Sequence, residues 1–65
     1  MFSKIITSRG TSFTVGEMGE YMATVEKITF VIGDPAINME ASYKVEFDNG
    51  DIVEVSDVVE VWYRS

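Results

Sequence analysis

Four carboxylates around the tip of one predicted hairpin are the first candidates for chemistry in this chain. They are Glu46, Asp48, Asp51 and Glu54, and they lie within nine residues of one another. Paired carboxylates perform acid–base chemistry only inside a pocket that perturbs their protonation, and a chain of 65 residues rarely encloses one. The chain also has no histidine, which is the usual general base. We therefore expect no catalytic residues and no enzyme activity.

The same loop invites a comparison with calcium sites, because hard cations are bound by clustered oxygen atoms. The segment Asp48-Asn49-Gly50-Asp51 has such oxygens, but it lacks the length and the bidentate glutamate of an EF-hand. With no cysteine and no histidine in the chain, the thiolate and imidazole ligands of transition metals are absent as well. We expect neither a metal nor another cofactor.

The charge of the chain is concentrated in its second half. The net charge is −6; residues 1–32 carry three acidic and three basic side chains, whereas residues 33–65 carry eight acidic and two basic ones. Because binding to a phosphate backbone requires cations, direct nucleic-acid binding is disfavoured. The four hairpin carboxylates are instead expected to form an acidic face, which keeps the protein soluble or contacts a protein partner.

An aromatic pair near the end of the chain is the best candidate for a contact patch. Trp62 and Tyr63 are adjacent, and Phe2 would lie beside them if the first and last strands pair. Aromatic side chains are enriched at the centres of protein interfaces. The alternation places Val61 and Tyr63 on one face and Trp62 on the other, so Trp62 either contacts a partner or covers an open end of the fold.

The strongest structural pattern covers residues 43–55, where apolar residues alternate on both sides of Asn49-Gly50. A two-residue loop would place Glu54 opposite Val45 and bury a carboxylate. A three-residue loop pairs Val45 with Val53 and is therefore expected. It predicts a type I turn with Gly50 in the left-handed region.

The rest of the chain also indicates strands. Residues 2–7 and 11–15 predict a first hairpin, and residues 21–32 a long strand whose alternation requires a β-bulge near Glu26-Lys27 to bury Ile28. Residues 33–40 indicate an irregular connection, with a single helical turn from Pro35 as the alternative. A single helical turn is expected at Ser56–Val59, followed by a closing strand at residues 60–64. The prediction is one all-β domain over residues 1–65: a five- or six-stranded antiparallel barrel.

The order of these motifs resembles the Tudor-type SH3-like barrels. The resemblance covers about residues 13–61 and has four parts, which are Phe13-Thr14-Val15-Gly16-Glu17, Glu20-Tyr21-Met22-Ala23-Thr24-Val25, Tyr43-Lys44-Val45-Glu46-Phe47-Asp48-Asn49-Gly50 and Val53-Glu54-Val55-Ser56-Asp57-Val58. Many Tudor domains bind methylated lysine or arginine in an aromatic cage. The resemblance implies Tyr21 and Phe47 as cage walls, although Glu20 stands where the family commonly has tryptophan. The alternative is that both aromatic residues cover a small core.

Two functions of different classes follow from these observations. The first is a noncatalytic protein–protein interaction module, acting as an adaptor or regulatory subunit, with a protein partner and with homo-oligomers as an open alternative. The second is a viral or mobile-element inhibitor that imitates nucleic-acid charge and blocks a host enzyme. No secretory signal or membrane-spanning apolar run is visible, so we expect a cytoplasmic protein without membrane contact.

Overall fold

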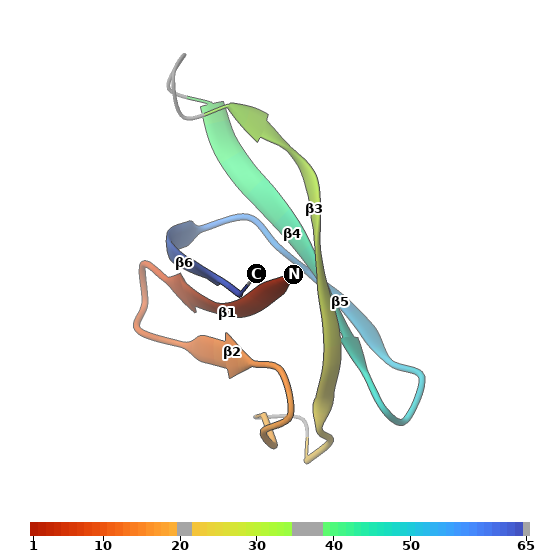
Figure 1. Cartoon of the computed structure of the whole chain (residues 1–65). Helices are drawn as coiled ribbons and strands as arrows, with labels where there is room; N and C mark the ends of the chain where they lie inside the picture. Colours follow the sequence, from red (N-terminus) through yellow and green to blue (C-terminus); the bar gives the residue numbers. More distant parts are fainter. Residues whose placement is uncertain (20–21, 35–38, 65) are drawn as a thin grey trace.

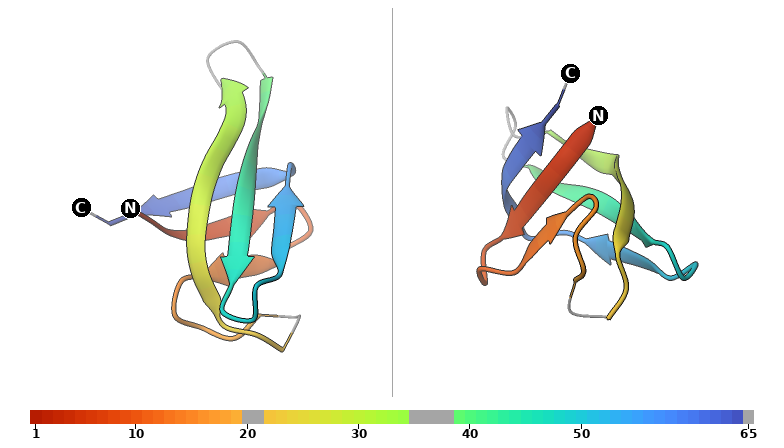
Figure 2. Two further views of the ribbon diagram at one scale, coloured as in Figure 1. Left: turned by 90° about the vertical axis from the view of Figure 1, so that its right-hand side faces the viewer. Right: turned by 60° about the horizontal axis from the view of Figure 1, so that its bottom comes forward.

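The computed structural model describes residues 1–19, 22–34 and 39–64. Its elements are strands alone, in the order β1 (Phe2–Thr7), β2 (Ser12–Thr14), β3 (Val25–Asp34), β4 (Met39–Phe47), β5 (Ile52–Val55) and β6 (Val58–Tyr63). They form two antiparallel three-stranded sheets, ordered β2-β1-β6 and β3-β4-β5. Figure 1 shows the second sheet rising past the first, and Figure 2 shows that the strands of the two sheets run nearly across each other. The all-β prediction is confirmed, but the sheets do not join into a closed barrel.

The β1–β2 and β4–β5 hairpins use the same three-residue loop. At the β4–β5 turn Phe47 N donates to Asp51 O (2.9 Å) and Gly50 N to Phe47 O (3.1 Å); at the β1–β2 turn Thr7 N donates to Thr11 O (2.8 Å) and Gly10 N to Thr7 O (3.0 Å). The last loop residue is a glycine with φ of +91° at Gly50 and +86° at Gly10, a conformation that glycine adopts without steric cost. The predicted three-residue loop at Gly50 is confirmed.

This loop sets the register that buries the apolar residues. Val45 lies opposite Val53 and Lys44 opposite Glu54, as the alternation predicts. The predicted β-bulge in β3 is also present, because the register with β4 shifts between Val25 and Lys27. The shift brings both Val25 and Ile28 into the core, where each is less than 5% exposed.

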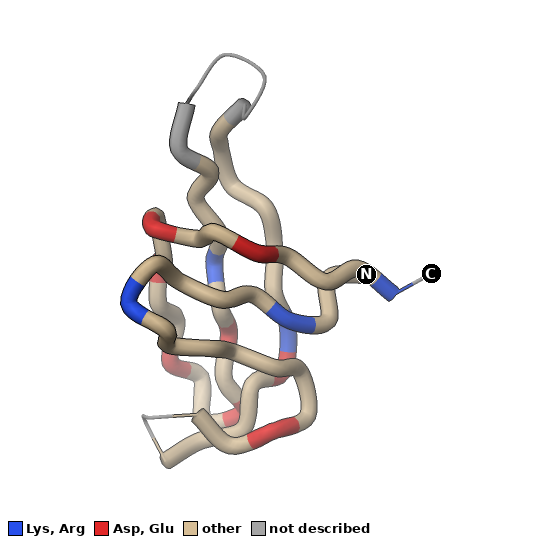
Figure 3. The backbone as a smooth tube through the Cα atoms, turned by 90° about the vertical axis from the view of Figure 1, so that its left-hand side faces the viewer, with Lys and Arg blue, Asp and Glu red and all other residues tan. Residues whose placement is uncertain are grey.

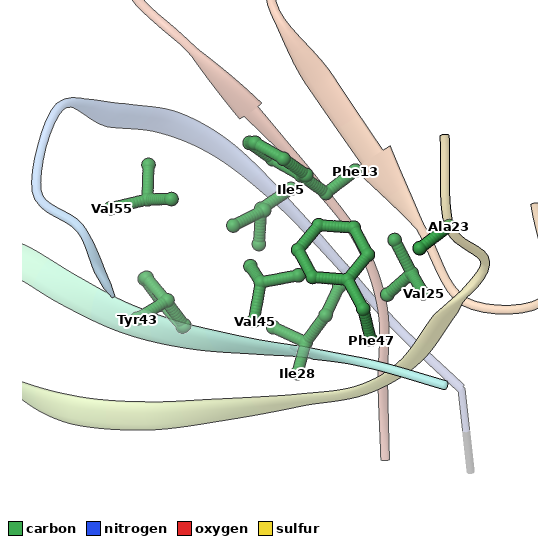
Figure 4. Packing of buried hydrophobic residues seen from close by; sticks show 9 residues of the cluster. All are labelled: Ile5, Phe13, Ala23, Val25, Ile28, Tyr43, Val45, Phe47 and Val55. Carbon is green, nitrogen blue, oxygen red and sulfur yellow. The ribbon is translucent and has the colours of Figure 1, made fainter. Parts of the chain in front are cut away.

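The core lies between the two crossed sheets, as Figure 4 shows. Nine buried apolar residues from five strands and the segment before β3 form it; they are Ile5, Phe13, Ala23, Val25, Ile28, Tyr43, Val45, Phe47 and Val55. Orthogonal packing of this kind joins two twisted sheets through their inner faces, while the outer faces stay in contact with water. The core is small, and most of the last strand lies outside it.

The corner between β5 and β6 differs from the prediction. The helical turn expected at Ser56–Val59 is wrong, since Val58 and Val59 already belong to β6. The reason is that Asp57 binds the β1–β2 loop: its carbonyl oxygen accepts from Ser8 N (2.8 Å), and its carboxylate accepts from Ser8 Oγ (3.1 Å) and lies 3.5 Å from Arg9 Nε. The alternative helical turn from Pro35 falls on residues 35–38, which lie outside the described residues.

The core can be tested with one conservative change at two sites. Ile5 is fully buried and Ile52 is 59% exposed, and both lie on strands. Ile5→Val removes one buried methyl group and is expected to lower the free energy of unfolding by about 1 kcal/mol, whereas Ile52→Val should change it by less than about 0.5 kcal/mol. Urea denaturation measures both values. Equal effects at the two positions would show that Ile5 does not lie in the core.

Candidate binding surface

The first feature of the surface is a seam where the two sheets separate. Val25, at the start of β3, is held against the turn that follows β2: Gly16 N donates to Val25 O (2.8 Å) and Val25 N to Glu17 O (3.0 Å). Beyond this point β3 pairs with β4 on one side, and its other edge borders an apolar groove of about 470 Å³. The groove is lined by Met1, Phe2, Val15, Tyr63 and the β3 segment 26–29, and we call it the seam groove.

A row of aromatic rings leads from the seam groove to Phe30 on β3. Phe2 contacts Tyr63 with ring centroids 5.2 Å apart at 86°, and Tyr43 with centroids 5.4 Å apart at 80°. Tyr43 in turn contacts Phe30 at 5.5 Å and 72°. Edge-to-face pairs at these distances are attractive beyond their burial. The row begins at exposed Tyr63, passes through buried Tyr43 and ends at exposed Phe30.

Trp62 lies on the opposite face of the first sheet from this row. Lys4 is its register partner, and Lys4 Nζ stands 5.5 Å from the centroid of the indole ring, within the range of a cation–π contact. Trp62 Nε1 donates to Glu60 Oε2 (3.1 Å), and the ring remains 54% exposed. The residues proposed as one aromatic patch are therefore divided: Phe2 and Tyr63 border the seam groove, whereas Trp62 faces outward.

A second hollow continues the seam groove onto that outer face. Its volume is about 210 Å³, and it shares Met1 and Val15 with the groove. Lys4, Trp62 and Arg64 also line it, together with the small residues Ser3 and Thr14. The expected meeting of the first and last strands is confirmed, since Phe2 pairs with Tyr63 and Arg64 N donates to Met1 O (2.7 Å). This pairing places the two cations in one hollow, which we call the cationic hollow.

Three of the four hairpin carboxylates, Glu46, Asp48 and Asp51, line one hollow of about 360 Å³ together with Glu26, whereas Glu54 does not line it. The acidic face stays a prediction. Asp48 Oδ1 accepts from Thr24 N (3.2 Å), Asp51 Oδ2 accepts from Asn49 Nδ2 (3.0 Å), and Glu54 Oε1 accepts from Ser42 Oγ (2.9 Å). Glu46, the fourth, lies opposite Lys27 in the register of the second sheet. Three of these carboxylates therefore support the turn and the sheet.

The fold also distributes charge between the sheets. In Figure 3 the strands in front, which belong to the first sheet, carry more blue relative to red than the sheet behind them. The strands β1, β2 and β6 contain one basic and one acidic residue, whereas β3, β4 and β5 contain two basic and five acidic residues. The β1–β2 loop and the residue after β6 add Arg9 and Arg64 to the first sheet. The segments next to β2 and β6 also add Glu17 and Asp57, and Asp57 lies 3.5 Å from Arg9 Nε, so the first sheet is close to neutral and the second is anionic.

The residues implied by the resemblance to Tudor domains have different outcomes. Phe47 lies in the core, 2% exposed, with its ring 6.4 Å from that of Phe13, so it is not an open cage wall in this structure. Its burial agrees with the alternative that it covers the core. Tyr21 falls outside the described residues.

The described part of the chain has neither a metal-binding cluster nor a membrane-spanning helix. No group of three or more acidic side chains there is arranged to hold a metal ion. No helix of the length and apolar character needed to cross a bilayer is present in residues 1–19, 22–34 and 39–64.

A scan against protein-family models and searches among curated proteins and solved structures found no match to this chain.

Sequence reasoning identified Phe2, Tyr63 and Trp62 but missed the seam groove and the cationic hollow. The groove exists because β3 bends away from the first sheet after its bulge, which alternation alone does not place in space. The hollow had a usable signal. Pairing of the first and last strands, with Lys4 near one end of the chain and Arg64 near the other, implies that these cations meet.

The exposure of Trp62 has a direct spectroscopic consequence. Trp62 is the sole tryptophan of the chain, so its fluorescence reports this site alone. Because more than half of the ring is exposed, the emission maximum is expected close to that of free tryptophan, with efficient quenching by acrylamide. A blue-shifted emission that resists acrylamide would contradict the outward position and would show that the ring is covered.

Proposed function

We propose that this chain is a noncatalytic protein–protein interaction module, acting as an adaptor or regulatory subunit. The observation that carries the proposal is strand β6, whose residues 59–63 are all exposed although four of them are large and apolar. These four are Val59, Val61, Trp62 and Tyr63. We place the module in the cytoplasm and keep homo-oligomers as an alternative way to cover this strand.

Two properties of β6 support binding to a partner. The strand pairs with β1 on one side, so its other edge presents backbone groups that a partner strand could bond. Isolated apolar side chains are common on protein surfaces, but several adjacent ones on an edge strand are typical of interaction sites. Tryptophan and tyrosine are also the residues most enriched among those that dominate binding energy.

We further propose that the fold is an open relative of the Tudor-type SH3-like barrel. Two features support this relationship. The strands of the two sheets run across each other, and their junction at Val25 is bridged by backbone hydrogen bonds from Gly16 and to Glu17. The resemblance concerns the fold and brings no ligand with it, because Phe47 is buried.

A second candidate function is inhibition of a nucleic-acid-handling enzyme by charge imitation. It is favoured by the anionic balance of the second sheet, where β3, β4 and β5 contain five carboxylates. It ranks second because lysines interrupt the row: Lys27 lies opposite Glu46, and Lys44 lies opposite Glu54. A surface of mixed sign imitates a phosphate backbone poorly.

The leading function is tested by capturing partners from a lysate of the cells that naturally contain the protein. Wild-type protein is compared with Val59→Asp and with the matched control Ile52→Asp, since Val59 and Ile52 are exposed to 67% and 59% on different sheets. We expect Val59→Asp to reduce recovery of the partner by about tenfold or more, because it places a charge in an apolar contact. Ile52→Asp should bind like wild type. Equal recovery with all three proteins would exclude β6 as the contact surface.

The second candidate has its own variant. Glu46→Lys reverses a charge and leaves the hydrogen bonds of the β4–β5 turn in place. Substitution of Asp48 or Asp51 would remove one of those hydrogen bonds. Imitation of nucleic acid predicts that this variant loses the partner and that binding weakens steeply with salt. The interaction module predicts that Glu46→Lys leaves recovery unchanged and that the partner stays bound at higher salt. These results separate the two functions.

A further inference from the structure

We propose that the seam groove and the cationic hollow bind an extended, acidic and apolar peptide segment of a partner protein, which adds as a strand to the free edge of β3. The proposal rests on the proposed function, because it names the kind of partner that an interaction module of this shape accepts. It places recognition at the junction of the two sheets, at a site separate from the outer edge of β6.

The backbone of β3 supplies the first part of the argument. In an antiparallel pair, alternate residues direct their N–H and C=O groups toward the partner strand, and the intervening residues direct theirs away from it. The β3 segment 26–29 lines the groove and has β4 on its other side. An edge strand with such outward groups is a template for an added strand, and the groove is the space beside it.

The walls of the groove supply the second part. Phe2 and Tyr63 form an edge-to-face pair on one side, and Val15 and Ile28 complete the apolar lining. A volume of about 470 Å³ lies within the usual range of roughly 300–1,000 Å³ for ligand sites. Because side chains of an added strand alternate, every second side chain of the peptide would enter this apolar space.

The charges around the two hollows determine which peptide fits. Lys27 lines the groove, Lys4 and Arg64 line the adjoining hollow, and Glu26 is the one carboxylate among the described residues that lines either of them. The chain as a whole has eleven carboxylates and five cations, so this is a local reversal of its charge. Three cations facing one carboxylate favour a peptide with Asp or Glu at the positions that reach the hollow, and they disfavour a basic one.

The experiment begins with selection of random octapeptides, displayed on phage, against the 65-residue protein at about 150 mM salt. We expect the enriched peptides to carry apolar residues at alternate positions and a net negative charge. A synthetic copy of the most enriched peptide is then titrated into wild type, into Lys4→Glu/Arg64→Glu and into the control Lys44→Glu. Lys44 lies on the second sheet opposite Glu54, and it lines neither hollow. The double variant should bind about tenfold or more weakly, whereas Lys44→Glu should bind like wild type.

Strand addition is tested separately by methylating the peptide backbone. Two copies of the peptide carry N-methyl groups at alternate residues, in the two possible registers. The copy whose methyl groups face β3 should lose binding, while the other should retain it, because only alternate amides bond an added strand. Amide hydrogen exchange should slow within residues 27–29 when the peptide binds. Equal tolerance of both methylated copies would overturn the added strand.

Other outcomes are equally decisive. Failure to enrich any peptide, enrichment of basic peptides, or equal binding by Lys4→Glu/Arg64→Glu and wild type would each overturn the proposal. If thermal denaturation shows that the double variant folds poorly, Lys27→Glu replaces it, because it removes the cation that β3 contributes to the seam groove and should also weaken peptide binding. If Val59→Asp abolishes partner capture while no peptide is enriched, the interaction module stands and this inference fails. If a peptide is enriched as described while Val59→Asp captures partners normally, the groove stands and the role of β6 fails.

Discussion

Burial of a few branched side chains between two crossed sheets is the constraint on which the rest of this structure depends. Ile5, Val25 and Val45 come from three different strands and are almost completely excluded from water. A chain of 65 residues without cysteine has no covalent staple, so this small core must hold both sheets together. Six strands offer more apolar surface than such a core can cover. The uncovered remainder, on β6 and along the seam, is where we place the binding surfaces.

Some of the acidic residues that the sequence suggests for recognition make structural hydrogen bonds in the turns. Asp48 accepts a hydrogen bond from Thr24 N, which links the β4–β5 turn to the segment just before β3. Asp57 accepts hydrogen bonds from Ser8, which link the β5–β6 corner to the β1–β2 loop. Carboxylates engaged in this way satisfy backbone and hydroxyl donors that would otherwise need water. They serve the architecture of the turns first.

Charge separation in this protein is a product of strand pairing. Along the chain, the second half is acidic and the first half is neutral. Folding brings Arg64 from the far end back beside Lys4, so the cations gather where β1 and β6 meet, while the second sheet keeps most of the carboxylates. Local fields of this kind select partners by sign even when the net charge is of the opposite sign. The cationic hollow therefore gives an acidic chain a place for an acidic ligand.

Local pattern alone determined the β-strand character of the chain, the three-residue loop ending at Gly50, the pairing of Val45 with Val53 and the bulge that buries Ile28, because each depends on residues close in sequence or on period-two alternation. The bounds of the long strand were wrong, since β3 runs from Val25 to Asp34 and not over residues 21–32. The aromatic residues of the surface were also found in this way. Tertiary structure decided that the sheets stay separate, that Trp62 faces away from Phe2 and Tyr63, that Asp57 starts a strand corner in place of a helical turn, and that the groove lies beside Lys27. These outcomes depend on how far β3 bends and on which residues distant in sequence come into contact. Period-two alternation indicates the face of the strand on which a side chain lies, but it does not indicate which residues pack against that face.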